Sequence, residues 1–234
     1  MKCKNKITLF IFLVLIIINL KLKINNKNLM TFKINYKSNS AKIAVLDSGY
    51  EQNNDENIKI VKIFDYDDGI DRYGHGKKVI DIINKSNKSA QIYSIKVLDD
   101  VGKGNRKRIL KALDWCYYNN IELINISFSM SIDDKLIKDK IDQLSELGVV
   151  VICSYDNTNI LSYPASYIST IGVTAHDKYF RKDDVFIYKD RMVAYGKDLE
   201  NSPGYYNSYA TARVTAFLSY NMDKIDEIRS KLNE

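Results

Sequence analysis

The chain has 234 residues and a formal net charge of +6 at pH 7, and this length is enough for one domain with a sizeable hydrophobic core. Six of its 35 basic residues lie in residues 1–29, which contain no acidic residue, so 29 basic residues remain against 29 acidic ones. The basic charge therefore belongs to the amino-terminal segment, and the rest of the chain lacks the basic surface of a nucleic-acid-binding domain. Three cysteines are too few to suggest a disulfide framework. Cys116 and Cys153 are predicted to be small core residues.

Residues 1–29 have the composition of a signal peptide or a membrane anchor. Lysines precede an apolar run over residues 7–20, which suits the apolar part of a secretory signal and is short for a membrane span of about 20 residues. No small-residue cleavage site follows the run; if the flanking lysines extend to the interface, residues 7–24 could just cross a bilayer. Both alternatives stay open and predict a secreted or a membrane-anchored protein, whereas translation from Met30 would leave a cytoplasmic one.

A polar linker over residues 30–40 is expected to lead into one domain over residues 41–234. In this domain, short apolar runs alternate with segments of helical periodicity, which is typical of an α/β domain with a mainly parallel sheet. Sites in such sheets form beyond the carboxyl ends of the strands, and Asp47, Gly102 and Asn157 lie at or just past predicted strand ends. The predicted strands are 43–46, 58–64, 90–98, 123–127, 149–153, 170–174, 185–188 and 192–195, and the predicted helices are 75–84, 105–119, 133–147, 208–220 and 222–233.

His75 is one of two histidines in the chain and lies between Gly74 and Gly76 at the predicted start of a helix. The glycines leave the backbone open to close approach, and the imidazole can be exposed while the helix packs behind it. Asp47, at the end of a buried strand, is either a turn cap or a group that orients His75. A carboxylate bonded to Nδ1–H would leave Nε2 free to act as a base. His176, the other histidine, lies outside every motif and is predicted to be on the surface.

Ser208 is the best candidate for a nucleophile that would act with His75. It opens a predicted helix in which the small residues Ala210 and Ala212 allow close approach to other elements. A serine at such a place is commonly an N-cap, but the free amides of the first helical turn could also stabilise an oxyanion.

Several short stretches follow one another along the chain in an order that points to one family. They are Val45-Leu46-Asp47-Ser48-Gly49, Gly74-His75-Gly76, Lys96-Val97-Leu98-Asp99 with Gly102-Lys103-Gly104, Leu123-Ile124-Asn125-Ile126-Ser127, Gly148-Val149-Val150-Val151-Ile152 ending at Asn157, Tyr163-Pro164-Ala165, and Ser208 with Ala210-Thr211-Ala212. Together they resemble the subtilisin-like serine peptidases, or subtilases, over residues 41–220. The resemblance implies a three-layer α/β fold of subtilisin type, with a mainly parallel central sheet flanked by helices.

The resemblance also implies a serine endopeptidase with a peptide or protein substrate. Ser208 would attack the scissile carbonyl, His75 would accept its proton, and Asp47 would support the imidazolium. Asn157 and the Ser208 amide would bind the oxyanion, and limited peptide or protein processing is the expected role. The substrate would be held as an added β-strand, with Gly102, Lys103 and Gly104 on one side and Ser127, Phe128 and Ser129 on the other.

Some residues depart from the usual subtilase motifs. Lys77 replaces a threonine after the histidine–glycine pair, and Tyr206-Asn207 replace glycine-threonine before Ser208. Ser129 and Asp156 replace glycines of the cleft, which predicts a smaller or unusually charged specificity pocket with Asp156 in contact with substrate. These departures keep a second hypothesis open, that of a catalytically silent subtilase fold that binds peptides.

The loop over residues 65–71 is acidic, and oxygen-rich loops bind calcium. Its spacing fits no known ligand loop, so a solvated loop is preferred and calcium is the alternative. The cysteines show no metal-ligand spacing, and no other cofactor is expected.

Overall fold

The structure is a computed structural model that describes residues 30–31, 40–51, 55–65, 67–158, 161–176, 184–199 and 206–234. In these ranges the strands form a nine-stranded sheet in the order β1-β8-β9-β7-β6-β5-β2-β4-β3. The strands are β1 (Met30–Thr31), β2 (Lys42–Asp47), β3 (Ile58–Val61), β4 (Gln91–Lys96), β5 (Leu123–Ile126), β6 (Val150–Ser154), β7 (Thr170–His176), β8 (Val185–Tyr188) and β9 (Arg191–Tyr195).

The sheet is parallel from β3 to β9, and only β8 runs antiparallel to its neighbours β9 and β1. Every residue of β5 and β6 is buried, as expected for parallel strands that are covered on both faces. The mainly parallel α/β architecture predicted from the sequence is confirmed.

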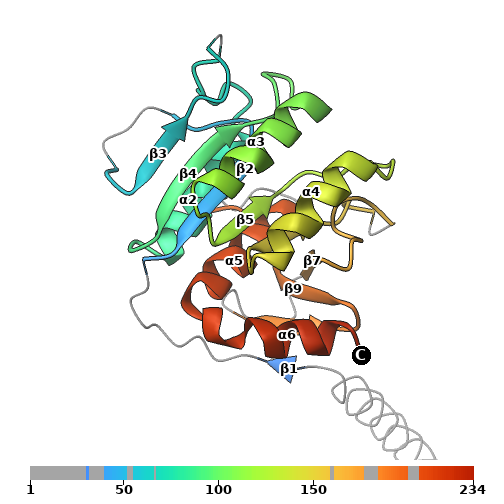
Figure 1. Ribbon diagram of the computed structural model, residues 1–234. Helices are drawn as coiled ribbons and strands as arrows, with labels where there is room; N and C mark the ends of the chain where they lie inside the picture. The colour runs from blue at the N-terminus through green and yellow to red at the C-terminus, as the bar shows by residue number, and fades with distance from the viewer. Residues whose placement is uncertain are drawn as a thin grey trace, which may run out of the picture.

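Helices cover both faces of the sheet and make it the middle of three layers (Figure 1). One core cluster joins α3 and α4 to one face, and a second joins α2, α5 and α6 to the other. Cys116 and Cys153 are fully buried in the first cluster, as predicted. The helices are α2 (His75–Ser86), α3 (Arg106–Tyr118), α4 (Lys135–Glu146), α5 (Asn207–Tyr220) and α6 (Ile225–Leu232), with a short 3-10 helix at Met222–Lys224.

The strand order changes direction at β2. After β2 the chain forms β3 at the edge of the sheet and returns through α2 to β4, which lies beside β2, and α3 then carries it past β2 to β5 on the other side. The helices α2 and α3 lie on opposite faces of the sheet. The carboxyl end of β2 therefore lies at a topological switch point, where open α/β sheets form their sites.

Some predictions made from the sequence were wrong in detail. His176 was expected on the surface, but it is 6% exposed and stacks on Phe186 with ring centroids 5.7 Å apart. The strand predicted over residues 58–64 ends at Val61. Met30 and Thr31, in the expected linker, pair with β8 as the short strand β1.

The expected leader over residues 1–29 lies outside the described residues. Within the described ranges, no helix combines the length and the hydropathy needed to cross a bilayer.

Candidate active site

Asp47 and His75 are in direct contact at the carboxyl end of β2. His75 Nδ1 lies 2.8 Å from Asp47 Oδ1. The same oxygen accepts hydrogen bonds from the Ser48 amide at 2.8 Å and from the Ser48 hydroxyl at 3.3 Å. The Asp47 side chain is 1% exposed and the His75 side chain 22%, so solvent reaches the ring but not the carboxylate. With Nδ1 held by the carboxylate, Nε2 is left for other partners, and the geometry favours the orienting role of Asp47.

The glycines on either side of His75 serve different purposes. A Cβ on Gly76 would lie 2.4 Å from the Gly49 carbonyl oxygen, so only glycine allows α2 to begin this close to the turn after β2. The Gly76 amide donates to Ser48 Oγ at 2.9 Å. Gly74 has open space around it, but its φ of 85° lies in the left-handed region that glycine favours.

Asp71 caps the first turn of α2 from the preceding loop. Its Oδ1 accepts from the amides of Gly74 at 2.7 Å and Tyr73 at 3.0 Å, and its Oδ2 accepts from the Lys77 amide at 2.8 Å. A carboxylate at this place satisfies amides that the helix leaves free and interacts favourably with the helix dipole. The cap holds the segment that carries His75.

Opposing effects act on the pKa of His75. Burial of the ring lowers it, whereas the charge and the hydrogen bond of Asp47 raise it, with a further contribution from the charge of Asp71. Lys78 lowers it in turn, and the net result is a pKa above the ordinary 6.5. The two carboxylates thus stabilise the protonated imidazole, the form that a general base acquires during its reaction.

Ser208 lies in the first turn of α5, directly before Tyr209. The Tyr209 ring stacks on that of His75, with centroids 6.0 Å apart and an interplanar angle of 25°. Tyr206, not Ser208, is the N-cap of α5. Among the described residues, the Ser208 amide, at the N-terminus of α5, donates to no acceptor.

The Ser208 hydroxyl donates to the Ser127 carbonyl oxygen at 2.8 Å. In the part of the chain that the structure describes, none of its hydrogen bonds goes to His75. Catalytic hydrogen bonds are often loose without substrate and tighten in the complex. The structure therefore brings Ser208 and His75 into one region, with the serine–histidine hydrogen bond not formed.

Asn157 follows β6 and is exposed. Its Oδ1 accepts from the Asn207 amide at 3.0 Å. Sequence reasoning treated Asn207 only as a departure from the family motif, yet it is 4% exposed and its side chain bonds to three backbone groups. The sequence did contain a signal for this role, the carboxamide directly before Ser208, because only a carboxamide side chain combines an acceptor oxygen with two N–H donors.

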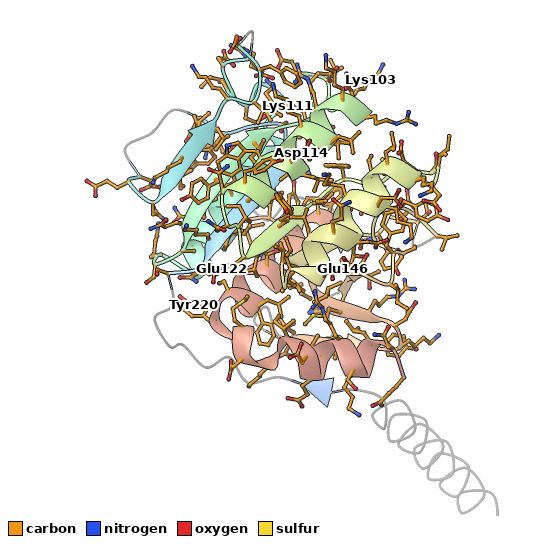
Figure 2. The ribbon with its side chains drawn as sticks, viewed as in Figure 1. Lys103, Lys111, Asp114, Glu122, Glu146 and Tyr220 are labelled. Atoms are coloured by element: carbon orange, nitrogen blue, oxygen red, sulfur yellow. The ribbon has the colours of Figure 1, made fainter. Side chains whose placement is uncertain are left out.

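The predicted substrate-binding loop after β4 approaches Tyr73, whose ring centroid lies 6.3 Å from that of His75. Gly102 has a φ of 77°, and a Cβ there would meet the Tyr73 ring at 2.6 Å. Gly104 pairs with Leu98 in an isolated antiparallel bridge. Lys103 is exposed and projects from the carboxyl edge of the sheet, whereas Glu122, just before β5, lies toward the opposite edge (Figure 2).

The second predicted substrate-binding stretch follows β5. Ser127 is buried, and its hydroxyl donates to Asn125 Oδ1 at 2.9 Å. Phe128 packs partly buried against the core, and Ser129 is exposed.

The Asp156 carboxylate is turned onto its own loop. It accepts hydrogen bonds from the Thr158 amide at 2.7 Å and from the Thr158 hydroxyl. These two bonds lower the pKa of Asp156. The Asp156 amide donates to Ser162 Oγ at 3.0 Å.

Lys77, another departure, is engaged away from Asp47. Its Nζ lies 2.6 Å from Asp81 Oδ2 and 3.3 Å from Glu51 Oε1. The Tyr50 hydroxyl donates to the other Asp81 oxygen at 2.9 Å.

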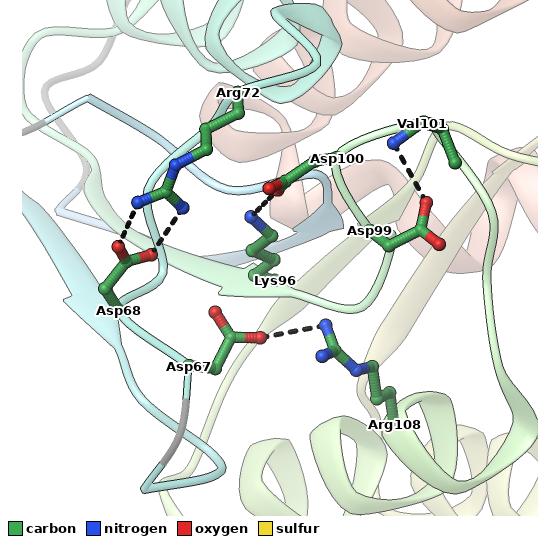
Figure 3. A pocket seen from close by; sticks show the side chains of 8 residues that line it. All are labelled: Asp67, Asp68, Arg72, Lys96, Asp99, Asp100, Val101 and Arg108. Atoms are coloured by element: carbon green, nitrogen blue, oxygen red, sulfur yellow. Dashed lines mark hydrogen bonds and ion pairs between the residues drawn. The ribbon is translucent and has the colours of Figure 1, made fainter.

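Ion pairs line a pocket of about 480 Å³ between the acidic loop and the loop after β4 (Figure 3). Arg72 pairs with Asp68 at 2.5 Å, Lys96 with Asp100 at 2.6 Å and Arg108 with Asp67 at 2.8 Å. Within the described ranges, no group of three or more His, Cys, Asp or Glu side chains is arranged to hold a metal ion. Two of the carboxylates that suggested calcium, Asp67 and Asp68, are thus paired with cations, and a third, Asp71, accepts backbone amides.

Comparisons with known proteins identify the family. The subtilase family model matches residues 38–228. Subtilisin E of Bacillus subtilis (strain 168) is 31% identical over 159 residues, which cover 60% of this chain and 42% of that protein. The minor extracellular protease Epr of the same organism is 30% identical over 161 residues, which cover 62% of this chain and 24% of that protein. The matched region thus spans less than half the length of either relative.

A solved structure, the crystal structure of a cold adapted subtilisin-like serine proteinase, superposes with a TM-score of 0.68 at 18% identity and covers 86% of this chain and 82% of that one. This likeness shows the fold. Because the family model matches most of the chain, the family is shown as well: the protein belongs to the subtilase family.

Proposed function

We propose that the protein is a serine endopeptidase that hydrolyses peptide bonds with Asp47, His75 and Ser208. The observation that carries the proposal is the 2.8 Å contact between the buried Asp47 carboxylate and His75 Nδ1, next to a helix whose first turn presents Ser208. Membership of the subtilase family supports the same chemistry.

In the proposed reaction, the Ser208 hydroxyl leaves the Ser127 carbonyl and turns toward His75 Nε2. Oγ then attacks the scissile carbonyl carbon while Nε2 takes the hydroxyl proton. The same proton passes to the leaving amine as the C–N bond breaks. Water attacks the acyl-enzyme in the second half and restores Ser208. Asp47 holds the ring and stabilises its charged form throughout.

The oxyanion would be stabilised by two donors, the Ser208 amide and Asn157 Nδ2. Because Asn157 Oδ1 accepts the Asn207 amide at 3.0 Å, the Nδ2 group is the free end of that carboxamide. Loss of one such side-chain donor typically costs about 3 kcal/mol in the transition state.

The substrate would bind as an extended strand between the loop 102–104 and the stretch 127–129. Main-chain hydrogen bonds would supply most of the affinity, and Asp156 would adjoin the specificity pocket. Limited peptide or protein processing fits a protein exported or anchored through residues 1–29. Among the relatives, Epr is by name an extracellular protease.

Digestion of an unfolded protein tests the proposal. The wild-type chain should cleave reduced, carboxymethylated casein at internal bonds, and Ser208→Ala should not. Folded wild-type protein that binds peptides but leaves them intact would contradict the proposal and favour the silent binding module.

A further inference from the structure

Asn207 connects three elements that meet behind Ser208. Its side chain accepts a hydrogen bond at Oδ1 from the Ala175 amide of β7 at 2.7 Å. Its Nδ2 donates to the carbonyl oxygens of Tyr155 at 3.2 Å and Asp156 at 2.7 Å, in the loop after β6. One carboxamide therefore ties the first residue of α5 to β7 and to this loop.

The backbone of Asn207 reaches the same loop. Its amide donates to Asn157 Oδ1 at 3.0 Å, one residue beyond the carbonyl of Asp156. Ser208 is the next residue along the chain. Asn207 thus holds the proposed nucleophile on one side and the proposed oxyanion donor on the other, with its side chain buried at 4% exposure.

We propose that Asn207 is a positioning residue that sets the placement of Asn157 relative to Ser208. The inference rests on the proposed peptidase function. Without the carboxamide, the loop carrying Asn157 loses two of its ties to α5, because the carbonyls of Tyr155 and Asp156 each lose a donor. The amide of Asn207 alone then has to orient the oxyanion donor.

The position of Asn207 determines which kinetic constant should change when its side chain is removed. Asn207 lies behind the site, so substrate affinity changes little, whereas a displaced oxyanion donor slows the chemical step. Asn207→Ala should lower kcat about tenfold to a hundredfold and leave KM within about twofold. Since the effect runs through Asn157, it should shrink to at most about twofold in an Asn157→Ala background.

The matched control is Asn221→Ala. Asn221 is a buried asparagine at the other end of α5, where its Nδ2 donates to the Phe217 carbonyl oxygen at 2.8 Å. Its replacement removes a comparable bond of the same helix and should leave kcat unchanged. If Asn207→Ala does not fold, Asn207→Ser removes the same carboxamide with a residue that is favourable near a helix start.

A readout without turnover separates this inference from the proposed function. Hydrogen exchange in the peptide spanning residues 154–158 should become about tenfold faster or more in Asn207→Ala, and stay unchanged in Asn221→Ala. If exchange is faster in Asn207→Ala but the wild-type protein has no peptidase activity, the peptidase function is refuted and the role of Asn207 in holding the loop stands. Unchanged exchange in Asn207→Ala, or equal kcat losses with and without Asn157, would overturn the positioning role.

Discussion

Gly76→Ala should disrupt the contact between His75 and Asp47 through a purely steric effect. The added Cβ would lie 2.4 Å from the Gly49 carbonyl oxygen, 3.0 Å from Gly49 N and 3.2 Å from Ser48 N. Ordinary contacts begin at 3.4 Å, and these atoms are all backbone, so no side chain can move aside. The start of α2 must therefore shift by about 1 Å away from the turn after β2. This shift moves His75 away from the Asp47 carboxylate and breaks the 2.9 Å hydrogen bond between the Gly76 amide and Ser48 Oγ.

Overpacking of this kind costs about 1–3 kcal/mol of stability, and a displacement of about 1 Å at a catalytic group lowers kcat/KM about a hundredfold. Urea unfolding and hydrolysis of a chromogenic peptide measure the two effects. Gly148→Ala is the control. Gly148 also has a positive φ, 86°, but it has open space around it and lies before the amino end of β6, at the opposite end of the strand from the site. It should lose about 1–2 kcal/mol and keep full activity. Equal activities of the two variants would refute the steric argument.

The remaining predictions concern charge. Because the folded pKa of His75 is raised above 6.5, the acid limb of the kcat/KM profile should lie above pH 6.5, and Asp47→Asn should move it to lower pH; a profile unaffected by Asp47→Asn would argue against the pairing. Because protonation of His75 is linked to folding, the stability that the His75–Asp47 pair contributes is fully present below about pH 6.5 and is lost as the pH rises through the folded pKa. In urea titrations, the free energy of unfolding of wild type should therefore exceed that of His75→Gln by less and less over that pH range. Asp67→Ala leaves the Arg108 guanidinium, 18% exposed, without this carboxylate and should cost about 2–3 kcal/mol after allowance for solvent screening; Asp68→Ala, at an exposed pair, serves as the small-effect control. EDTA should leave the Tm within about 1 °C, since Asp67 and Asp68 of the acidic loop pair with Arg108 and Arg72; a lower Tm that calcium restores would speak for a metal site.

The fold could be predicted because its strongest signals are local. Apolar runs such as Val150–Ser154 are too short for helices and are buried on both faces, and α3 buries Ile109, Ala112, Leu113 and Cys116 at helical spacing. The end of β3 was missed because Ile63 and Phe64 are buried apolar residues outside the strand. Apolar composition alone does not separate strand from buried loop.

The site could be predicted only as a set of residues. Asp47 and His75 lie 28 positions apart, and the family motifs bring them together by order and spacing. Side-chain directions need the surrounding structure: Lys77 turns to Asp81, and the Ser208 hydroxyl turns to Ser127. The role of Asn207 depends on Ala175, Tyr155 and Asp156, whose backbone groups converge only in the folded sheet.

The central claim, that Ser208 is a nucleophile activated by His75, is tested most directly by mapping a fluorophosphonate adduct by mass spectrometry. If His75 activates Ser208, folded protein should carry about one phosphonyl group per chain, located on Ser208 and lost in both Ser208→Ala and His75→Ala. An adduct on another residue, or no adduct on folded wild-type protein, would contradict it.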